Sequence, residues 1–395
     1  MKKIHTAGIV AIILLIFSVA IAISQLRKKQ EIESLHFSRQ ETEFLVSAPA
    51  GVSSSLFRAG KTLEDFQKIT DIQGSTLWLS PANYFLNAKF PDGNVFYYPV
   101  TTVGYRLGPD ESAFAVTIRP QKATPPTLAN AIPEYAYIPA GTFLFGDKLN
   151  PQEPHYLWLT SYFISRFEVS NFEFRQFIHD SIGYNDSRNW EIAGIQWKQN
   201  HRHESSASIK PDDSEYVRFG QPDQPVTRVC WYEASAYCKW LTRKYGKNQW
   251  LFSLPSEAEW EKAARGPDSF DYGLGMTISD DEAALYNWKK NPDAAVTVVG
   301  NLKTQRSFHA NRYGIYHASG NVVEWTQSVF LPFNRSKPYD EYQRNRLDLS
   351  GQRVARGGSW YSASIALLYL PYRDAFQQDI RNHDLGFRIV AKPVF

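Results

Sequence analysis

The stretch Arg-Gly-Gly-Ser-Trp-Tyr-Ser-Ala-Ser at residues 356–364, followed by Leu-Gly-Phe-Arg at 385–388, says more about the fold of this chain than any other part. Paired glycines permit tight turns and close backbone approach. Tryptophan, tyrosine and arginine side chains suit a shaped binding surface. The stretch contains no cysteine, and the whole chain has only Cys230 and Cys238. We therefore expect a site here whose chemistry does not use a thiol.

The composition is that of a folded protein with room for two or three domains: 395 residues, 43% hydrophobic and 15% aromatic. A net charge of +3 is too small to indicate a nucleic-acid partner, and we expect none. Cys230 and Cys238 lie eight residues apart in a predicted helix. That spacing separates them by about 12 Å, beyond disulfide reach, so we expect two buried free thiols.

The amino terminus carries a mostly apolar run of 17 residues, Ala7–Ile23, with basic residues on both sides. As a helix it would be about 26 Å long, close to the thickness of a membrane core. We expect residues 1–25 to be an uncleaved single-pass anchor in the inner membrane, with the bulk of the chain in the periplasm. The alternative is a cleaved signal peptide, since Ala20-Ile21-Ala22 resembles a cleavage site. The flanking charges are nearly balanced and do not settle the orientation.

Four further segments follow from the patterning of the chain. Residues 26–44 are polar and predict a juxtamembrane helix or stalk. Residues 45–120 predict a small all-β module without chemistry of its own, with short β-rich runs at 77–79, 84–90, 95–103 and 113–118 divided by turn clusters such as Pro91-Asp92-Gly93-Asn94. Residues 121–133 form a Pro-rich linker. Residues 134–395 form one large domain.

The large domain shows clear element boundaries. A strand, turn and strand are expected over residues 135–143, and a strand over 163–169. Ser170 with Glu173, and Ser256 with Glu259, have the spacing of capping boxes that open helices. A further helix is predicted over residues 232–241.

Six strings in this domain resemble, in order and spacing, the formylglycine-generating-enzyme (sulfatase-modifying factor) family. They are Ile-Pro-Ala-Gly-Thr-Phe (138–143), Glu-Val-Ser-Asn (168–171), Leu-Pro-Ser-Glu-Ala-Glu-Trp-Glu-Lys-Ala-Ala-Arg-Gly (254–266), Ser-Gly-Asn-Val-Val-Glu-Trp (319–325), Arg-Gly-Gly-Ser-Trp (356–360) and Leu-Gly-Phe-Arg (385–388). The resemblance covers residues 134–395. It implies an irregular, C-type-lectin-like α+β domain, here preceded by the transmembrane helix and the all-β module.

The resemblance also implies where a copper site would lie. Sulfatase-activating members have two cysteines shortly after the Gly-Gly-Ser segment, which bind copper and support oxidation of a substrate cysteine. The matching positions here are Ser362 and Leu367. Neither offers the soft thiolate that Cu(I) prefers. We therefore expect no copper and assign no catalytic residues.

We likewise expect no iron site. The sulfoxide-synthase branch resembles an iron enzyme with a His-x-x-x-Glu-x-His-type motif, which this chain lacks. The nearest cluster, His201-Arg202-His203, favours a solvated loop over a metal site.

Calcium is the metal that the resemblance favours. One family site would match the carbonyls of Gly320 and Val322 and the carboxylate of Glu324, oxygen ligands that suit a hard cation. His317 stands where the family usually has asparagine. The second site would use Asn287 and the carbonyl of Trp288. The alternative is that Glu324 and Asn321 satisfy loop backbone groups without metal.

The groove of the resembled fold would be lined by Ser359, Trp360, Tyr361 and Ser362. Arg373 and Arg388 could recognise a carboxylate or peptide as rigid two-pronged donors. The alternative is that both pair with internal acids such as Asp374 and Asp384.

The functional hypothesis is a membrane-anchored pseudoenzyme that binds a protein or peptide partner, or belongs to an envelope complex. The alternative is an active oxidoreductase or maturation enzyme of the same family that uses a different cofactor.

Overall fold

The structure is a computed structural model that describes residues 42–72, 76–80, 82–102, 114–117, 134–147, 156–278, 309–333 and 339–394. The expected anchor at Ala7–Ile23, the linker at 121–133, and Asn287 and Trp288 lie outside these residues. Within them, every helix is too short or too polar to span a bilayer.

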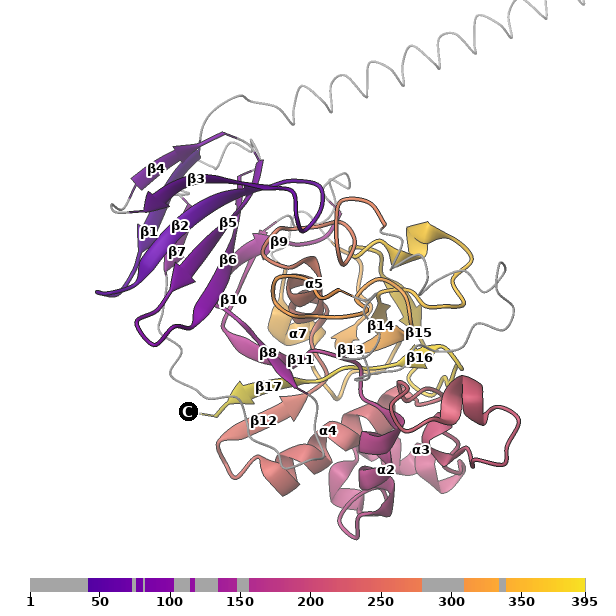
Figure 1. Cartoon of the computed structure of the whole chain (residues 1–395). Helices are drawn as coiled ribbons and strands as arrows, with labels where there is room; N and C mark the ends of the chain where they lie inside the picture. The colour runs from indigo at the N-terminus through magenta and orange to yellow at the C-terminus, as the bar shows by residue number, and fades with distance from the viewer. Residues whose placement is uncertain are drawn as a thin grey trace, which may run out of the picture.

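An all-β region forms the first part of the described chain (Figure 1, indigo and purple). Its strands are β1 (Thr42–Ser47), β2 (Ser53–Ala59), β3 (Phe66–Ile72), β4 (Thr76–Leu79), β5 (Ala82–Lys89), β6 (Val95–Thr102) and β7 (Phe114–Thr117). One sheet has the antiparallel order β3-β2-β5-β6. In the other, β1 pairs antiparallel with β4 and parallel with β7. Phe44, Leu56 and Leu86 are fully buried in one cluster that joins the two sheets.

The expected β-rich runs between residues 77 and 118 coincide with β4 to β7, whereas β1 to β3 were missed. Strand β3 is mostly exposed and carries Gln67, Lys68 and Asp71, so it lacks the alternation that marks a half-buried strand. Strand β1 begins at Thr42, inside the residues predicted to form a stalk. Its pairing with β7 joins segments far apart in sequence, which local patterning does not reveal.

The large domain combines helices with two four-stranded sheets, and Figure 1 shows how these elements are arranged. Its longer helices are α2 (Asn171–His179), α3 (Ile192–Gln199), α4 (Trp231–Tyr245) and α5 (Glu257–Arg265). Its short helical segments are η1 (Ser187–Asn189), η2 (Ser206–Ser208), η3 (Tyr216–Gly220), α7 (Glu341–Arg344) and η5 (Ile365–Leu368).

The strands of the domain fall into three groups. The first sheet has the order β12-β17-β11-β8, built from β12 (Trp250–Ser253), β17 (Val390–Pro393), β11 (Tyr162–Ser165) and β8 (Tyr135–Ile138). The second has the order β15-β14-β13-β16, built from β15 (Asp374–Phe376), β14 (Arg353–Arg356), β13 (Val323–Val329) and β16 (Leu385–Gly386). A separate pair joins β9 (Gly141–Leu144) and β10 (Tyr156–Leu159).

Both predicted capping boxes are present. The Ser170 hydroxyl accepts from the Glu173 N–H, and the Glu173 carboxylate accepts from the Ser170 N–H. Ser256 and Glu259 make the same reciprocal pair at the start of α5. Such pairs satisfy amide groups that the first turn of a helix leaves without partners.

The two cysteines confirm the expectation from their spacing. Cys230 precedes α4 as its N-cap and Cys238 lies within that helix; both are free and buried. They belong to the main hydrophobic cluster, together with Trp231 and Trp240 of the same helix. Burial raises the pKa of both thiols well above the usual cysteine range, so neither is a ready thiolate.

Helix α5 is buried along its whole length although it is rich in charge. Each charged side chain therefore needs an internal partner. The Glu261 carboxylate accepts from Arg265 Nε at 2.8 Å. The Lys262 ammonium donates to the carbonyls of Pro139 at 2.7 Å and Gly141 at 3.0 Å. The charged side chains of α5 thus hold the surrounding loops in place by hydrogen bonds.

Arg312 joins the all-β region to the large domain. Its guanidinium lies over the rings of Phe66 and Phe85, at 4.6 and 4.5 Å from their centroids. Its Nε also donates to Asp268 at 2.8 Å. A second contact packs Phe96 edge-on against Tyr137, with centroids 5.0 Å apart.

Candidate functional site

The turn after β14 is built on two glycines in left-handed backbone conformations, Gly357 (φ 93°) and Gly358 (φ 65°). A Cβ on Gly358 would lie 2.6 Å from the carbonyl oxygen of Leu367, closer than real contacts allow. Only glycine therefore fits, because it tolerates both the backbone conformation and the close approach. The turn therefore lies in close contact with Leu367, at the start of the segment that holds Ser359 and Ser362.

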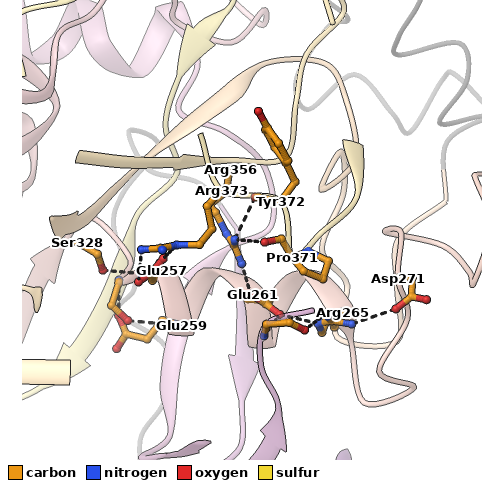
Figure 2. A network of polar contacts seen from close by, with 12 residues as sticks. Glu257, Glu259, Glu261, Arg265, Asp271, Ser328, Arg356, Pro371, Tyr372 and Arg373 are labelled. Carbon is orange, nitrogen blue, oxygen red and sulfur yellow. Dashed lines mark hydrogen bonds and ion pairs between the residues drawn. The ribbon is translucent and has the colours of Figure 1, made fainter. Parts of the chain in front are cut away.

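Arg356 and Arg373 connect this segment to helix α5, as Figure 2 shows. Arg356 donates to the Glu261 carboxylate and to the carbonyls of Pro371 (2.8 Å) and Tyr372 (3.0 Å). Arg373 donates to both oxygens of Glu257, at 2.7 and 3.1 Å. Both guanidinium groups are therefore bound to internal acceptors and stabilise the position of this segment against α5.

Arg388 is also bound internally. Its Nε and Nη2 donate to the two oxygens of Glu324 at 2.6 Å each. Its remaining N–H groups donate to the carbonyls of Ser165, Arg166 and Tyr316. The guanidinium thus has all five donors in use and offers none to a ligand.

The pairing of Arg373 and Arg388 with internal acids was one of the two sequence expectations. The acids differ from the two named there, since Glu257 and Glu324 take the places expected of Asp374 and Asp384. A single sequence does not identify them, because β13 and α5 reach these arginines only through the tertiary fold.

The Glu324 carboxylate is engaged by neighbouring side chains and is not available to a cation. Both its oxygens accept from Arg388, and Oε2 also accepts from Trp260 Nε1 at 2.7 Å. Burial raises the pKa of this carboxyl, and Arg388 opposes that shift. A Ca²⁺ ligand needs a carboxylate with a free lone-pair direction toward the metal. The calcium site expected at Gly320, Val322 and Glu324 therefore fits this arrangement poorly.

His317 and Asn321 lie beside Glu324 and serve a second buried acid, Glu168. His317 Nδ1 lies 3.1 Å from one Glu168 oxygen, and Asn321 Nδ2 donates to the other at 2.8 Å. Burial works to raise the pKa of Glu168, but His317 and Arg388 outweigh it and lower that pKa. The described residues contain no cluster of three His, Cys, Asp or Glu side chains arranged to hold a metal.

The positions that resemble the family's copper ligands hold a hydroxyl and an aliphatic side chain. The Ser362 hydroxyl accepts from the Ser359 N–H at 2.9 Å, and Ser362 is buried. The Ser359 hydroxyl donates to Asp384 at 2.6 Å. These hydroxyls stabilise the loop.

Aromatic rings gather beside this loop, in what we call the aromatic surface: Phe219, Trp360, Tyr361 and His383. The His383 ring lies 5.2 Å from Trp360, 4.9 Å from Tyr361 and 6.1 Å from Phe219. Tyr361 is 43% exposed, whereas Trp360 is only 5% exposed. The indole N–H of Trp360 has no hydrogen-bond partner in the described part of the chain. The surface thus offers apolar area, and the indole N–H of Trp360 lies enclosed beneath it.

Arg218 completes the aromatic surface. Its guanidinium lies over Phe219 at 5.2 Å and over Trp360 at 5.8 Å. Arg218 and Phe219 belong to the π-helical turn η3, a conformation often found at functional sites.

Sequence reasoning placed Trp360 and Tyr361 in the groove but missed Arg218, Phe219 and His383. No spacing rule links these three to residues 359–362, so only the fold brings them together.

The histidines of the 201–203 cluster are separated by the fold. His201 is exposed and stacks on Trp197, with centroids 4.8 Å apart. The prediction of a solvated loop implied an exposed His203, but this side chain is partly buried. It contacts the hydroxyls of Ser205 and Ser208 at 2.9 and 2.8 Å, and burial lowers its pKa. Its role is structural.

These features define a mixed α/β domain built on buried arginine–glutamate pairs and a Gly-Gly turn. Residues 121–393 match the family described as "Sulfatase-modifying factor enzyme 1-like domain". The chain belongs to this family, and the match confirms the resemblance on which the fold prediction rested.

Three curated relatives illustrate the range of the family. The chain is 26% identical over 234 residues to the serine/threonine-protein kinase pkn1 of Chlamydia caviae, covering 58% of this chain and 33% of that protein. It is 30% identical over 248 residues to the hercynine oxygenase of Mycolicibacterium smegmatis, covering 56% of this chain and 53% of that protein.

The third relative is the formylglycine-generating enzyme of Streptomyces coelicolor. It is 25% identical over 289 residues, covering 64% of this chain and 87% of that enzyme. The chain therefore spans about a third and about half of the first two relatives, and most of the third.

Proposed function

We propose that this protein is a binding member of its family, in which the aromatic surface holds an extended segment of a partner protein. The observation that carries the proposal is the aromatic surface itself: an exposed Tyr361 beside His383, with Arg218 stacked on Phe219 and Trp360. Tyrosine, tryptophan and arginine are the side chains that dominate protein-binding surfaces.

Trp360 supports the proposal through its unpartnered indole N–H, which is enclosed in the free protein and becomes accessible when the partner displaces the side chains that cover it. A buried donor without a partner costs free energy, which a bound acceptor removes. A main-chain carbonyl of an extended peptide supplies such an acceptor. Tyr361 and His383 then pack against the neighbouring side chains of that peptide.

The proposal includes the absence of cysteine-to-formylglycine oxidation. It rests on the chemistry of the residues at the two thiol positions, since the hydroxyl of Ser362 and the hydrocarbon of Leu367 do not bind Cu(I) as thiolates do. The only thiols of the chain, Cys230 and Cys238, are buried in and beside α4.

A display experiment tests the binding proposal. A random peptide library is selected against the purified protein and, in parallel, against Tyr361→Ala and Tyr342→Ala. Tyr361 and Tyr342 are both exposed, at 43% and 75%, so neither substitution empties the core. We expect a common peptide motif whose binding is lost in Tyr361→Ala and kept in Tyr342→Ala. Equal enrichment on all three proteins, or none on any, contradicts the proposal.

The rival function is an active oxidoreductase with another cofactor, and the relationship to a hercynine oxygenase motivates it. Metal analysis of the protein as purified separates the two. Stoichiometric iron or copper, with oxygen uptake on a cysteine peptide, favours the enzyme. A protein without a redox metal favours the binding function.

We further propose that residues 1–25 anchor the protein in the inner membrane with the large domain in the periplasm. The uninterrupted apolar run Ala7–Ile23 supports this proposal. Protease added to spheroplasts degrades the large domain if the proposal holds, and the protein stays in the membrane fraction after a carbonate wash. Release of the protein by that wash contradicts the anchor.

A further inference from the structure

A concave site lies away from the aromatic surface, at the start of α3. This pocket has a volume of about 600 Å³ and lies between α3 and the segments 347–351 and 377–379. The volume is in the range of small-ligand sites. None of the aromatic-surface residues lines it, so the two sites are independent. We call it the α3 pocket.

The floor of the α3 pocket is rigid. Gln378 is buried, and its Nε2 donates to the carbonyls of Leu349 at 3.2 Å and Gly351 at 3.0 Å. The Gln378 carbonyl in turn accepts from the Trp231 N–H at 3.0 Å. The acceptor for Trp231 is the main-chain carbonyl, so Gln378 ties the loop on one wall to the first turn of α4 through both its side chain and its backbone.

The lining charge of the α3 pocket is of one sign. Glu191, Asp348 and Asp379 line it, and its lining residues include no lysine, arginine or histidine. Glu191 pairs with Lys239 at 2.5 Å, outside the lining. Asp348 pairs with Arg346 on the exposed rim, an ion pair that contributes little because both side chains are solvated.

Asp379 is the least compensated of the three acids. It is exposed, and within the described ranges no hydrogen bond or ion pair reaches its carboxylate. A cation bound in the pocket can therefore pair with the Asp379 carboxylate. It can also displace Arg346 from Asp348 and pair with that second carboxylate.

Two aromatic side chains, Trp197 and Tyr232, add to this wall. Trp197 is 8% exposed, and its indole N–H has no hydrogen-bond partner in the described part of the chain. A guanidinium already rests on its ring, since Arg381 lies 4.7 Å from the centroid. His201 also stacks on this ring, at 4.8 Å. Aromatic faces attract cations, so Tyr232 is the ring of this wall that a ligand cation can meet. This indole nitrogen of Trp197 is enclosed by the protein, so it is not part of the surface that a ligand meets.

We propose that the α3 pocket binds a basic residue of a peptide or protein. The ammonium or guanidinium lies among Asp348, Asp379 and Glu191, and the aliphatic stem packs against Tyr232. This site does not depend on the aromatic surface, so either proposal can fail alone.

Calorimetric titration with small capped residues tests the α3 pocket. The probes are N-acetyl-arginine amide and N-acetyl-lysine amide, with the uncharged N-acetyl-norleucine amide as the comparison. We expect binding of at least one basic probe, weakened about threefold to tenfold by Asp379→Asn and by Asp348→Asn, and weakened by added salt. Norleucine amide should not bind measurably.

Asp92→Asn is the matched control, because it removes the same charge from an exposed turn of the all-β region. It should bind the basic probe as the unmodified protein does. The proposal is overturned if neither basic probe binds, if norleucine amide binds as well as they do, or if Asp379→Asn and Asp348→Asn both leave the affinity unchanged. Thermal unfolding of each variant shows that the fold is retained.

Discussion

Arg388 and Glu324 form a two-pronged ion pair in the core, with both N–O distances at 2.6 Å and each side chain only 1% exposed. Glu324 lies on β13 and Arg388 just before β17, so the pair joins strands of the two sheets of the large domain. In this pair Arg388 binds both oxygens of the Glu324 carboxylate, which the family resemblance implied as a calcium ligand. It is a structural element of the frame rather than part of a binding site.

Replacing Arg388 by methionine should destabilise the protein strongly. The substitution leaves the Glu324 carboxylate buried with the Trp260 indole but without a compensating charge, which costs about 3–5 kcal/mol in comparable buried pairs. Urea unfolding followed by tryptophan fluorescence measures the change. Arg346→Met is the control, because its pair with Asp348 is exposed, and it should cost less than about 1 kcal/mol. Similar losses in both variants would contradict the role of the buried pair.

Gly358→Ala should destabilise the protein more than Gly93→Ala. Both glycines have positive φ, 65° and 86°, so each alanine adopts an unfavourable backbone at about 1–2 kcal/mol. Only at Gly358 would the new Cβ also meet a backbone atom, the carbonyl of Leu367 at 2.6 Å. We expect a further loss of about 1–3 kcal/mol there, measured by the same unfolding experiment. Equal losses at the two positions would show that the loop moves away freely.

Ser256→Ala should cost about 1 kcal/mol, because it removes the side-chain half of the capping box that begins α5. The Glu259 amide would then lose its partner in a buried environment. Ser214→Ala is the control, since Ser214 lies exposed in a loop, and should change the unfolding free energy by less than about 0.5 kcal/mol. A loss at Ser256 no larger than at Ser214 would mean that water replaces the cap.

Lys262 should make stability depend on pH above neutrality. Burial lowers the pKa of its ammonium from 10.5 to about 7. Between those values the folded state holds fewer protons than the unfolded state. The stability of the protein therefore rises with pH across this window, by up to about 1.4 kcal/mol per pH unit, and the full cost of burying the charge persists below pH 7.

The Lys262→Met variant isolates this effect. Its unfolding free energy should lack the rise that the unmodified protein shows between pH 7 and pH 9. Chemical denaturation at pH 6, 7.5 and 9 measures both proteins. Parallel pH profiles would mean that the two carbonyls bonded to Lys262 keep its pKa near the ordinary value.

Much of the large domain follows from local sequence. The capping boxes at Ser170 and Ser256 were predictable because both partners of each box lie within four residues. The helix expected over residues 232–241 forms as α4, which runs from Trp231 to Tyr245. Strand β3 was missed because its exposed polar side chains hide the period-two pattern.

The candidate sites were less predictable. Ser359 to Ser362 were found through the Gly-Gly motif, but Arg218 and His383 join Trp360 from distant segments. Arg373 and Arg388 were placed in the binding groove, with pairing to acids such as Asp374 and Asp384 as the alternative, yet their partners Glu257 and Glu324 come from α5 and β13. The α3 pocket has no motif at all, since its walls come from four separate parts of the chain.

The sequence by itself determined the family, the helix starts and the absence of a thiol beside the Gly-Gly turn, because each depends on residue identity or on contacts within a few residues. Only the tertiary structure decided which charges are neutralised inside and which remain for a ligand. It did so because the partner of a buried arginine or glutamate is set by packing between distant segments. Arg388 is therefore part of the frame, whereas Tyr361 and Asp379 are exposed.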